Sequence, residues 1–173
     1  DLATKSHNDS KKRVLVVNGG PGTGKSVLAI NLLVELTNRN MIVYYVTKNS
    51  APREVFYSQL KGSFSANYIR NLFKGSGSFI DEESNTFDVL LVDEAHRLNA
   101  KSGMFKNLGE NQIKEIINAS KFSVFFLDEN QKVTMDDIGS LELIEKYSSL
   151  FNAELKTVKL ESQFRCNGSA GYL

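Results

Sequence analysis

Short apolar runs alternate along the chain with longer stretches in which apolar residues recur at helical spacing. The runs at residues 14–17, 41–46, 89–92 and 122–127 are almost continuously apolar and rich in β-branched and aromatic side chains. Such runs are typical of strands that are buried on both faces of a parallel sheet. Residues 153–160 alternate more strongly between apolar and polar side chains, which predicts a strand nearer the edge of the sheet.

The stretches between these runs predict helices. Residues 24–38 carry apolar side chains on most sides, which indicates a helix packed against the sheet. Ile113, Ile116 and Ile117 mark a second helix, and residues 140–151 predict a third. Strands that alternate with helices in this way predict an α/β fold with a parallel sheet.

A glycine-rich turn follows the first apolar run and leads directly into the first helical stretch. Its sequence at residues 19–26, Gly-Gly-Pro-Gly-Thr-Gly-Lys-Ser, fits the G-x-x-x-x-G-K-[ST] pattern of a phosphate-binding loop. Gly20, Gly22 and Gly24 are expected to adopt positive φ, so that successive N–H groups surround an anion. The following helix adds the positive end of its dipole. We therefore predict that a nucleoside triphosphate contacts this whole loop: Gly20, Pro21, Gly22, Thr23, Gly24, Lys25 and Ser26.

Four residues are expected to bind phosphate and Mg²⁺ and to activate water. Two of them end the loop, and the other two are acids that follow a later strand. Lys25 is expected to reach the β- and γ-phosphates, and the Ser26 hydroxyl to ligate Mg²⁺. Asp93 and Glu94 follow the run at 89–92, at the carboxyl end of a strand, where ligands of parallel sheets bind. Asp93 suits a direct or water-mediated partner of Mg²⁺, and Glu94 suits the base that orients an attacking water. The alternative is a strand that simply leaves the core through two acids.

Composition narrows the class of protein. The 173 residues suit one domain, and a net charge of +1 gives no global electrostatic argument for nucleic acid, membrane or acidic substrates. The single cysteine, Cys166, cannot form an internal disulfide, and with His7 and His96 it offers no zinc-type cluster, which favours a reducing, cytoplasmic compartment. No apolar stretch approaches the roughly 18 residues of a membrane span. Residues 1–12 are expected to form a solvated polar tail.

One segment suggests a possible nucleic-acid contact. Residues 53–74 contain four basic residues against one acid, with aromatic side chains interleaved, a composition that can bind single strands by stacking and phosphate pairing. Ile69, Leu72 and Phe73 fall at helical spacing, however, and the preferred interpretation is an amphipathic helix that packs on the core.

Four motifs together resemble a known family. They are the phosphate-binding loop, Asp-Glu-Ala-His at 93–96, Leu-Asp-Glu-Asn-Gln at 127–131 and Leu-Glu-Ser-Gln-Phe-Arg-Cys at 160–166. Their order and spacing resemble the first RecA-like domain of superfamily 1 DNA/RNA helicases. The resemblance is greatest to a bacterial helicase-like P-loop family that is related to the helicase-like part of the Schlafen proteins. It covers residues 13–173. Leu127 replaces the glycine of the family's G-D-x-x-Q pattern, and Gln163 and Phe164 replace an asparagine and a tyrosine.

The resemblance implies roles for further residues. In this family the acidic pair binds Mg²⁺ and activates water, which are the roles of Asp93 and Glu94 here. The glutamine that matches Gln131 senses the γ-phosphate and couples hydrolysis to movement on nucleic acid, and the arginine that matches Arg165 contacts the γ-phosphate. The resemblance also implies a three-layer RecA-like sandwich with strand order 5-1-4-3-2. A second RecA-like domain, outside residues 13–173, is expected to supply an arginine that completes the site.

The sequence therefore predicts an ATPase motor domain that couples hydrolysis of Mg²⁺-bound ATP to DNA or RNA, with single strands as the expected partner. ATP is favoured over GTP because no N-K-x-D guanine-reading motif is present. Without the arginine of the second domain, weak hydrolysis is expected, since an arginine supplied in this way is worth about 10³–10⁵ in rate. Two alternatives remain open: a P-loop kinase of a small molecule, and a non-catalytic switch that uses ATP to change its affinity for a partner.

Overall fold

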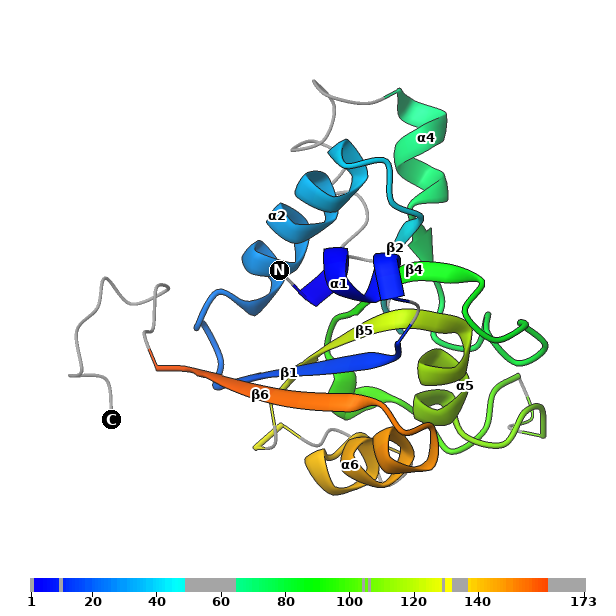
Figure 1. Cartoon of the computed structure of the whole chain (residues 1–173). Coiled ribbons are helices and arrows are strands. Elements are labelled where there is room, and N and C mark those ends of the chain that lie inside the picture. The colour runs from blue at the N-terminus through cyan, green and yellow to red at the C-terminus, as the bar shows by residue number, and fades with distance from the viewer. Residues whose placement is uncertain are drawn as a thin grey trace.

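The computed structural model of the protein describes residues 2–9, 11–48, 65–103, 105, 107–128, 130–131 and 137–161. Within these residues, six parallel strands form one sheet, and helices cover both of its faces (Figure 1). The strands are β1 (Arg13–Gly19), β2 (Val43–Val46), β3 (Phe73–Lys74), β4 (Phe87–Val92), β5 (Ser120–Leu127) and β6 (Glu154–Leu160). The α/β fold with a parallel sheet is thus confirmed.

The strand order across the sheet is β3-β2-β4-β5-β1-β6. The five strands that the sequence predicted, numbered by themselves, lie in the expected order 5-1-4-3-2, with β5 between β1 and β4. The structure differs by one strand, because β3 extends the sheet beyond β2. β3 has two residues, too few to carry a recognisable periodicity in the sequence.

Alternate side chains of the strands enter two hydrophobic clusters, one on each face of the sheet. The first face is covered by α1 (Leu2–Asp9), α2 (Lys25–Asn38) and α4 (Ala66–Asn71), and the second by α5 (Gln112–Ala119) and α6 (Leu141–Leu150). On β4, for example, Leu91 belongs to the first cluster and its neighbour Leu90 to the second, and both are fully buried. Burial on both faces explains why this strand is a continuous apolar run.

The helices predicted at residues 24–38, 113–117 and 140–151 all form, and local capping fixes where two of them begin. The Asn111 side chain accepts a hydrogen bond from the backbone N–H of Ile113 at 3.0 Å, before α5. The Ser140 hydroxyl caps α6 in the same way. Among the described residues, no helix combines the length and the apolar character needed to cross a membrane.

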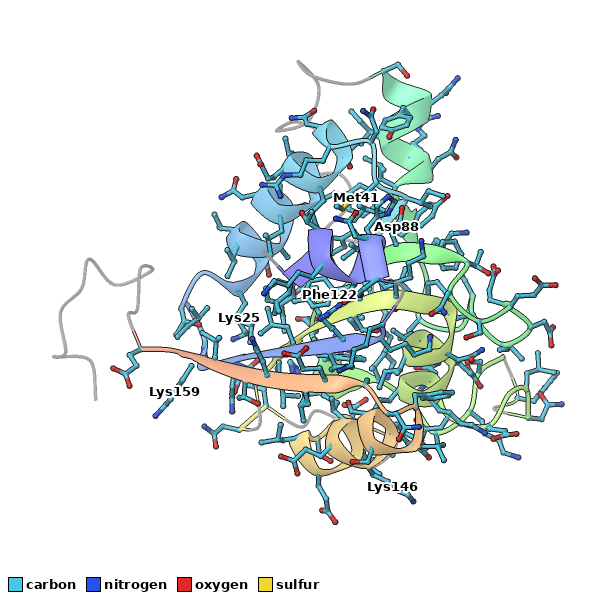
Figure 2. The ribbon with its side chains drawn as sticks, in the orientation of Figure 1. Lys25, Met41, Asp88, Phe122, Lys146 and Lys159 are labelled. Atoms are coloured by element: carbon cyan, nitrogen blue, oxygen red, sulfur yellow. The ribbon has the colours of Figure 1, made fainter. Side chains whose placement is uncertain are left out.

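The N-terminal segment corrects one prediction. A solvated tail was expected over residues 1–12, but Leu2–Asp9 form α1, which packs on the sheet beside β4 and β5 (Figure 1). The buried Arg13 guanidinium is 2.6 Å from the Asp9 carboxylate. His7 Nδ1 lies 2.9 Å from Oδ1 of Asp88, near the start of β4; Asp88 is labelled in Figure 2. These contacts hold a helix whose own sequence is too polar to indicate burial.

The segment at residues 53–74 follows the packing interpretation as far as it is described. Ile69 and Leu72 are buried at the end of α4, and Phe73 is buried on β3. All three join the cluster on the first face of the sheet. Residues 53–64, with the remaining aromatic side chains of this segment except Tyr68, lie outside the described residues.

Candidate active site

Three adjacent strands bring the candidate residues to one edge of the sheet. β5 pairs with β1 so that Leu127 lies opposite Asn18, and on its other side β5 pairs with β4. Because these strands are parallel, their carboxyl ends share an edge. Gly19 ends β1, Asp93 follows β4 and Asp128 follows β5. The glycine-rich loop and the acidic pair therefore meet where ligands of open parallel sheets bind.

The glycine-rich loop has the left-handed backbone that a phosphate cradle requires at two positions. Gly22 has φ 75° and Gly24 has φ 86°, values that side-chain-bearing residues rarely adopt. Positive φ was expected at Gly20 as well, and this is wrong, since Gly20 is not among the residues with positive φ. Gly19 is required for a different reason: a Cβ there would be 2.6 Å from Thr23 Oγ1. That hydroxyl in turn donates to the Gly20 carbonyl at 2.9 Å, which closes the loop on itself.

Lys25 is the first residue of α2 and lies against this loop (Figure 2). Its Nζ donates to the carbonyl oxygens of Gly19 at 2.5 Å and Gly20 at 2.7 Å. The same Nζ is 3.6 Å from Asp128 Oδ2, and the Asp128 side chain is almost fully buried. The ammonium group is thus held by two carbonyl groups of the glycine-rich loop and by the carboxylate that follows β5.

Ser26 connects the loop to the acidic pair. Its Oγ donates to Asp93 Oδ2 at 2.9 Å. Asp93 Oδ2 also accepts a hydrogen bond from the hydroxyl of Tyr45 at 2.5 Å, and Asp93 Oδ1 accepts one from the backbone N–H of Glu94 at 3.0 Å. Asp93 is buried, so both of its oxygens are fixed by donors of the chain.

Glu94 has a strained backbone. With φ 48° and ψ 46° it lies in the left-handed region, directly before the short 3₁₀ helix η1 (Ala95–Arg97). Such a conformation is unfavourable for a residue with a side chain, and this kind of strain gathers at functional sites. The Glu94 side chain is 39% exposed, and its Oε2 is 3.3 Å from Arg97 Nη1. This carboxylate is therefore oriented by a cation and open to water at the same time.

His96 lies just behind the acidic pair and is buried. Burial lowers the pKa of its imidazole, and this effect outweighs the opposing charges of Glu94 and Asp128. His96 is thus uncharged at neutral pH. Its Nδ1 is a buried atom without a hydrogen-bond partner within the described part of the chain.

Two predicted site residues are not joined to this group by any described side-chain contact. Gln131 is exposed, and its backbone N–H donates to the Asp128 carbonyl at 3.1 Å, which places it at the end of β5. Arg165 lies outside the described residues. The roles given to Gln131 and Arg165 therefore stay predictions.

Asp128 and Tyr45 were not among the predicted site residues, although both contact one. Asp128 could have been found, because it follows a buried strand just as Asp93 does. Tyr45 could not, because it belongs to an apolar run that predicts only a buried strand. The pattern gives the face of the strand, but not the atom that a long side chain reaches.

The side-chain oxygen atoms at this edge of the sheet suit the binding of a triphosphate together with Mg²⁺. Ser26 and Asp93 offer a hydroxyl and a carboxylate oxygen, the hard ligands that Mg²⁺ prefers. Among the described residues, no three His, Cys, Asp or Glu side chains gather into a metal-binding group. Mg²⁺ usually takes one or two protein oxygens and completes its shell with water and phosphate, so two ligands beside a phosphate cradle are sufficient.

Comparisons with known proteins point to one family. The family model for the Schlafen group 3 DNA/RNA helicase domain matches residues 12–173. Among solved structures, the chain is similar to a DNA replication initiation factor, with 20% identity and a TM-score of 0.44 over 95% of this chain and 46% of that one. It is also similar to AMPPCP-bound DnaA from Aquifex aeolicus, with 18% identity and a TM-score of 0.43 over the same shares. No curated protein matches it. The chain spans less than half the length of these two structures.

Proposed function

Because the chain belongs to the Schlafen group 3 DNA/RNA helicase domain family, we propose that it is a superfamily 1 type motor domain that binds and hydrolyses Mg²⁺-bound ATP and couples hydrolysis to DNA or RNA. The observation that carries this proposal is the 2.9 Å contact between Ser26 Oγ and Asp93 Oδ2. It joins the phosphate loop to the acidic pair, the two halves that hydrolysis of a nucleoside triphosphate needs.

The residues of the loop bind and orient the nucleotide. Backbone N–H groups of the cradle and the Lys25 ammonium carry the charge that offsets the phosphates. Ser26 and Asp93 would hold Mg²⁺, which would supply Lewis-acid chemistry and neutralise phosphate charge when bound. Lys25 now contacts the carbonyls of Gly19 and Gly20, so it has to exchange these contacts for phosphate oxygens when nucleotide enters.

Glu94 is the proposed general base. Its carboxylate is partly exposed and is anchored by Arg97, so it can accept a proton from water while keeping one orientation. The acidic pair that follows β4 is the arrangement expected for activation of water, and this favours hydrolysis over the kinase alternative. By resemblance, Gln131 senses the γ-phosphate and Arg165 contacts it.

The coupling to nucleic acid rests on the family and on two exposed side chains of α4. Tyr68 and Arg70 are exposed on α4, and they suit stacking and phosphate pairing with a single strand. Lys48 lies two residues beyond the end of β2. Its Nζ forms an ion pair with Asp137 Oδ1 at 2.9 Å, so this charge is already neutralised within the protein. A second RecA-like domain that supplies an arginine to the site is part of the proposal.

The test is the steady-state release of phosphate from ATP with and without single-stranded DNA and single-stranded RNA. The proposal expects at least one of the two to raise the rate. An equal rate in all three conditions, with ATP bound and hydrolysed, would leave an ATPase but refute the coupling.

A further inference from the structure

Tyr45 occupies an unusual place for a polar side chain. It lies on β2 in the first-face cluster and is fully buried. Its ring packs on Phe73 of β3, with 5.3 Å between the ring centroids, and the cluster around it includes Ala29 and Leu33 of α2. The ring thus fills the space between sheet and helix. Its hydroxyl reaches Asp93 at the carboxyl edge of the sheet, where Ser26 of the first turn of α2 contacts the same carboxylate.

The hydroxyl meets the carboxylate that is proposed to hold Mg²⁺. Tyr45 donates to Asp93 Oδ2 at 2.5 Å, and Ser26 donates to the same oxygen at 2.9 Å. Of these two donors, Ser26 is itself a proposed ligand and is therefore shared with the ion. Tyr45 is not a proposed ligand of the ion, so its hydroxyl can orient Asp93 both with and without Mg²⁺.

We propose that Tyr45 is a positioning residue for Mg²⁺: its hydroxyl holds the Asp93 carboxylate in the orientation that the ion requires. This inference rests on the proposed function, since it concerns the same site. Hydrogen bonds to a ligating carboxylate are a general way to orient it, and removing such a partner costs about 10- to 100-fold in metal affinity.

The test compares Tyr45→Phe with Tyr44→Phe in binding of a fluorescent ATP analogue. Tyr44 is the matched control because it is the adjacent residue on β2 and packs on the other cluster, edge to face with Phe87 at 5.2 Å. Each protein is titrated with the analogue in EDTA and then with rising Mg²⁺ at fixed analogue. Two quantities are measured: the affinity for the analogue without metal, and the Mg²⁺ concentration that gives half of the metal-dependent change in fluorescence.

Tyr45→Phe keeps the ring and removes only the hydroxyl, so affinity in EDTA should match wild type. The Mg²⁺ concentration at half of the change should rise about tenfold in Tyr45→Phe, the smaller of the losses in metal affinity expected when such a partner is removed. Tyr44→Phe should behave as wild type. An unchanged Mg²⁺ concentration at half of the change in Tyr45→Phe overturns the inference and leaves the proposed function standing. So does an equal loss of affinity in EDTA and in Mg²⁺, which indicates a packing role. If the wild-type protein does not bind the analogue, the proposed function itself fails.

Discussion

Gly139 packs directly against the backbone of Ala95, the residue that follows the acidic pair. A Cβ at Gly139 would lie 1.8 Å from the Ala95 carbonyl oxygen, a distance that no arrangement of side chains can relieve. Next to this contact, the backbone N–H of Ile138 donates to the Leu98 carbonyl at 2.8 Å. The segment before α6 therefore supports the turn that carries Glu94.

Gly139→Ala should accordingly disturb the acidic turn. Overpacking of this kind costs about 1–3 kcal/mol of unfolding free energy, and it should lower ATP hydrolysis more than ATP binding, because the displaced backbone of Ala95 adjoins Glu94 and does not belong to the cradle. Urea unfolding and ATPase rates measure the two effects. Gly75→Ala is the matched control, because a Cβ there meets its nearest neighbour, Ser78 Oγ, at an ordinary 3.7 Å. Equal behaviour of the two variants would contradict the proposed support.

Lys25→Ala should weaken nucleotide binding while the fold is kept. Loss of one charged hydrogen-bond donor to the phosphates predicts an affinity about 10- to 100-fold lower. Isothermal titration with ATP gives the affinity, and circular dichroism reports the fold. Lys159→Ala, which removes an exposed lysine of β6 (Figure 2), should change neither. A native spectrum together with wild-type affinity in Lys25→Ala would refute the cradle assignment.

Asp88 should make the attachment of α1 sensitive to acid. Burial by itself would raise the pKa of this carboxyl, but hydrogen bonds from Lys121, the Ile42 backbone and His7 prevail and lower it. A lowered pKa stabilises the folded state above the ordinary value of 3.8, and this stabilisation is lost as pH falls through the folded-state pKa.

Asp88→Asn should therefore destabilise the protein by about 1–3 kcal/mol at pH 7, the cost of leaving buried partners unpaired. The difference in unfolding free energy between the variant and the wild type should become smaller at pH values below the ordinary pKa of the carboxyl. Urea unfolding at a series of pH values measures it, with Asp81→Asn, in an exposed position, as the control. A difference that is the same at acid and neutral pH would contradict the assignment.

The sequence was sufficient for those parts of the fold that depend on local pattern. Buried strands, three helices and the glycine-rich loop each leave a periodicity or a motif, so these elements and the positions of Lys25, Ser26 and Asp93 followed from them. The order of the five expected strands followed from the family resemblance instead. Asp128 was within reach of the same reasoning, because it also follows a buried strand.

What could not be predicted depends on contacts between distant segments. α1 is polar in sequence and is held by Arg13 and Asp88, which belong to two different strands. The Tyr45 hydroxyl acts on Asp93 from two strands away in the chain, and the need for glycine at position 139 comes from Ala95. Each of these is a tertiary contact that leaves no local signal.

The most direct test of the account is to measure ATP bound and ATP hydrolysed by Glu94→Gln in the presence of Mg²⁺. Glutamine keeps the shape of the side chain but cannot accept the proton of the attacking water. Binding should stay close to wild type while the single-turnover rate of hydrolysis falls by about 10²–10⁴, the usual contribution of a general base. The bound nucleotide, recovered after quenching, should then be ATP. Hydrolysis at the wild-type rate in this variant would contradict the proposed role of Glu94 and with it the mechanism of this site.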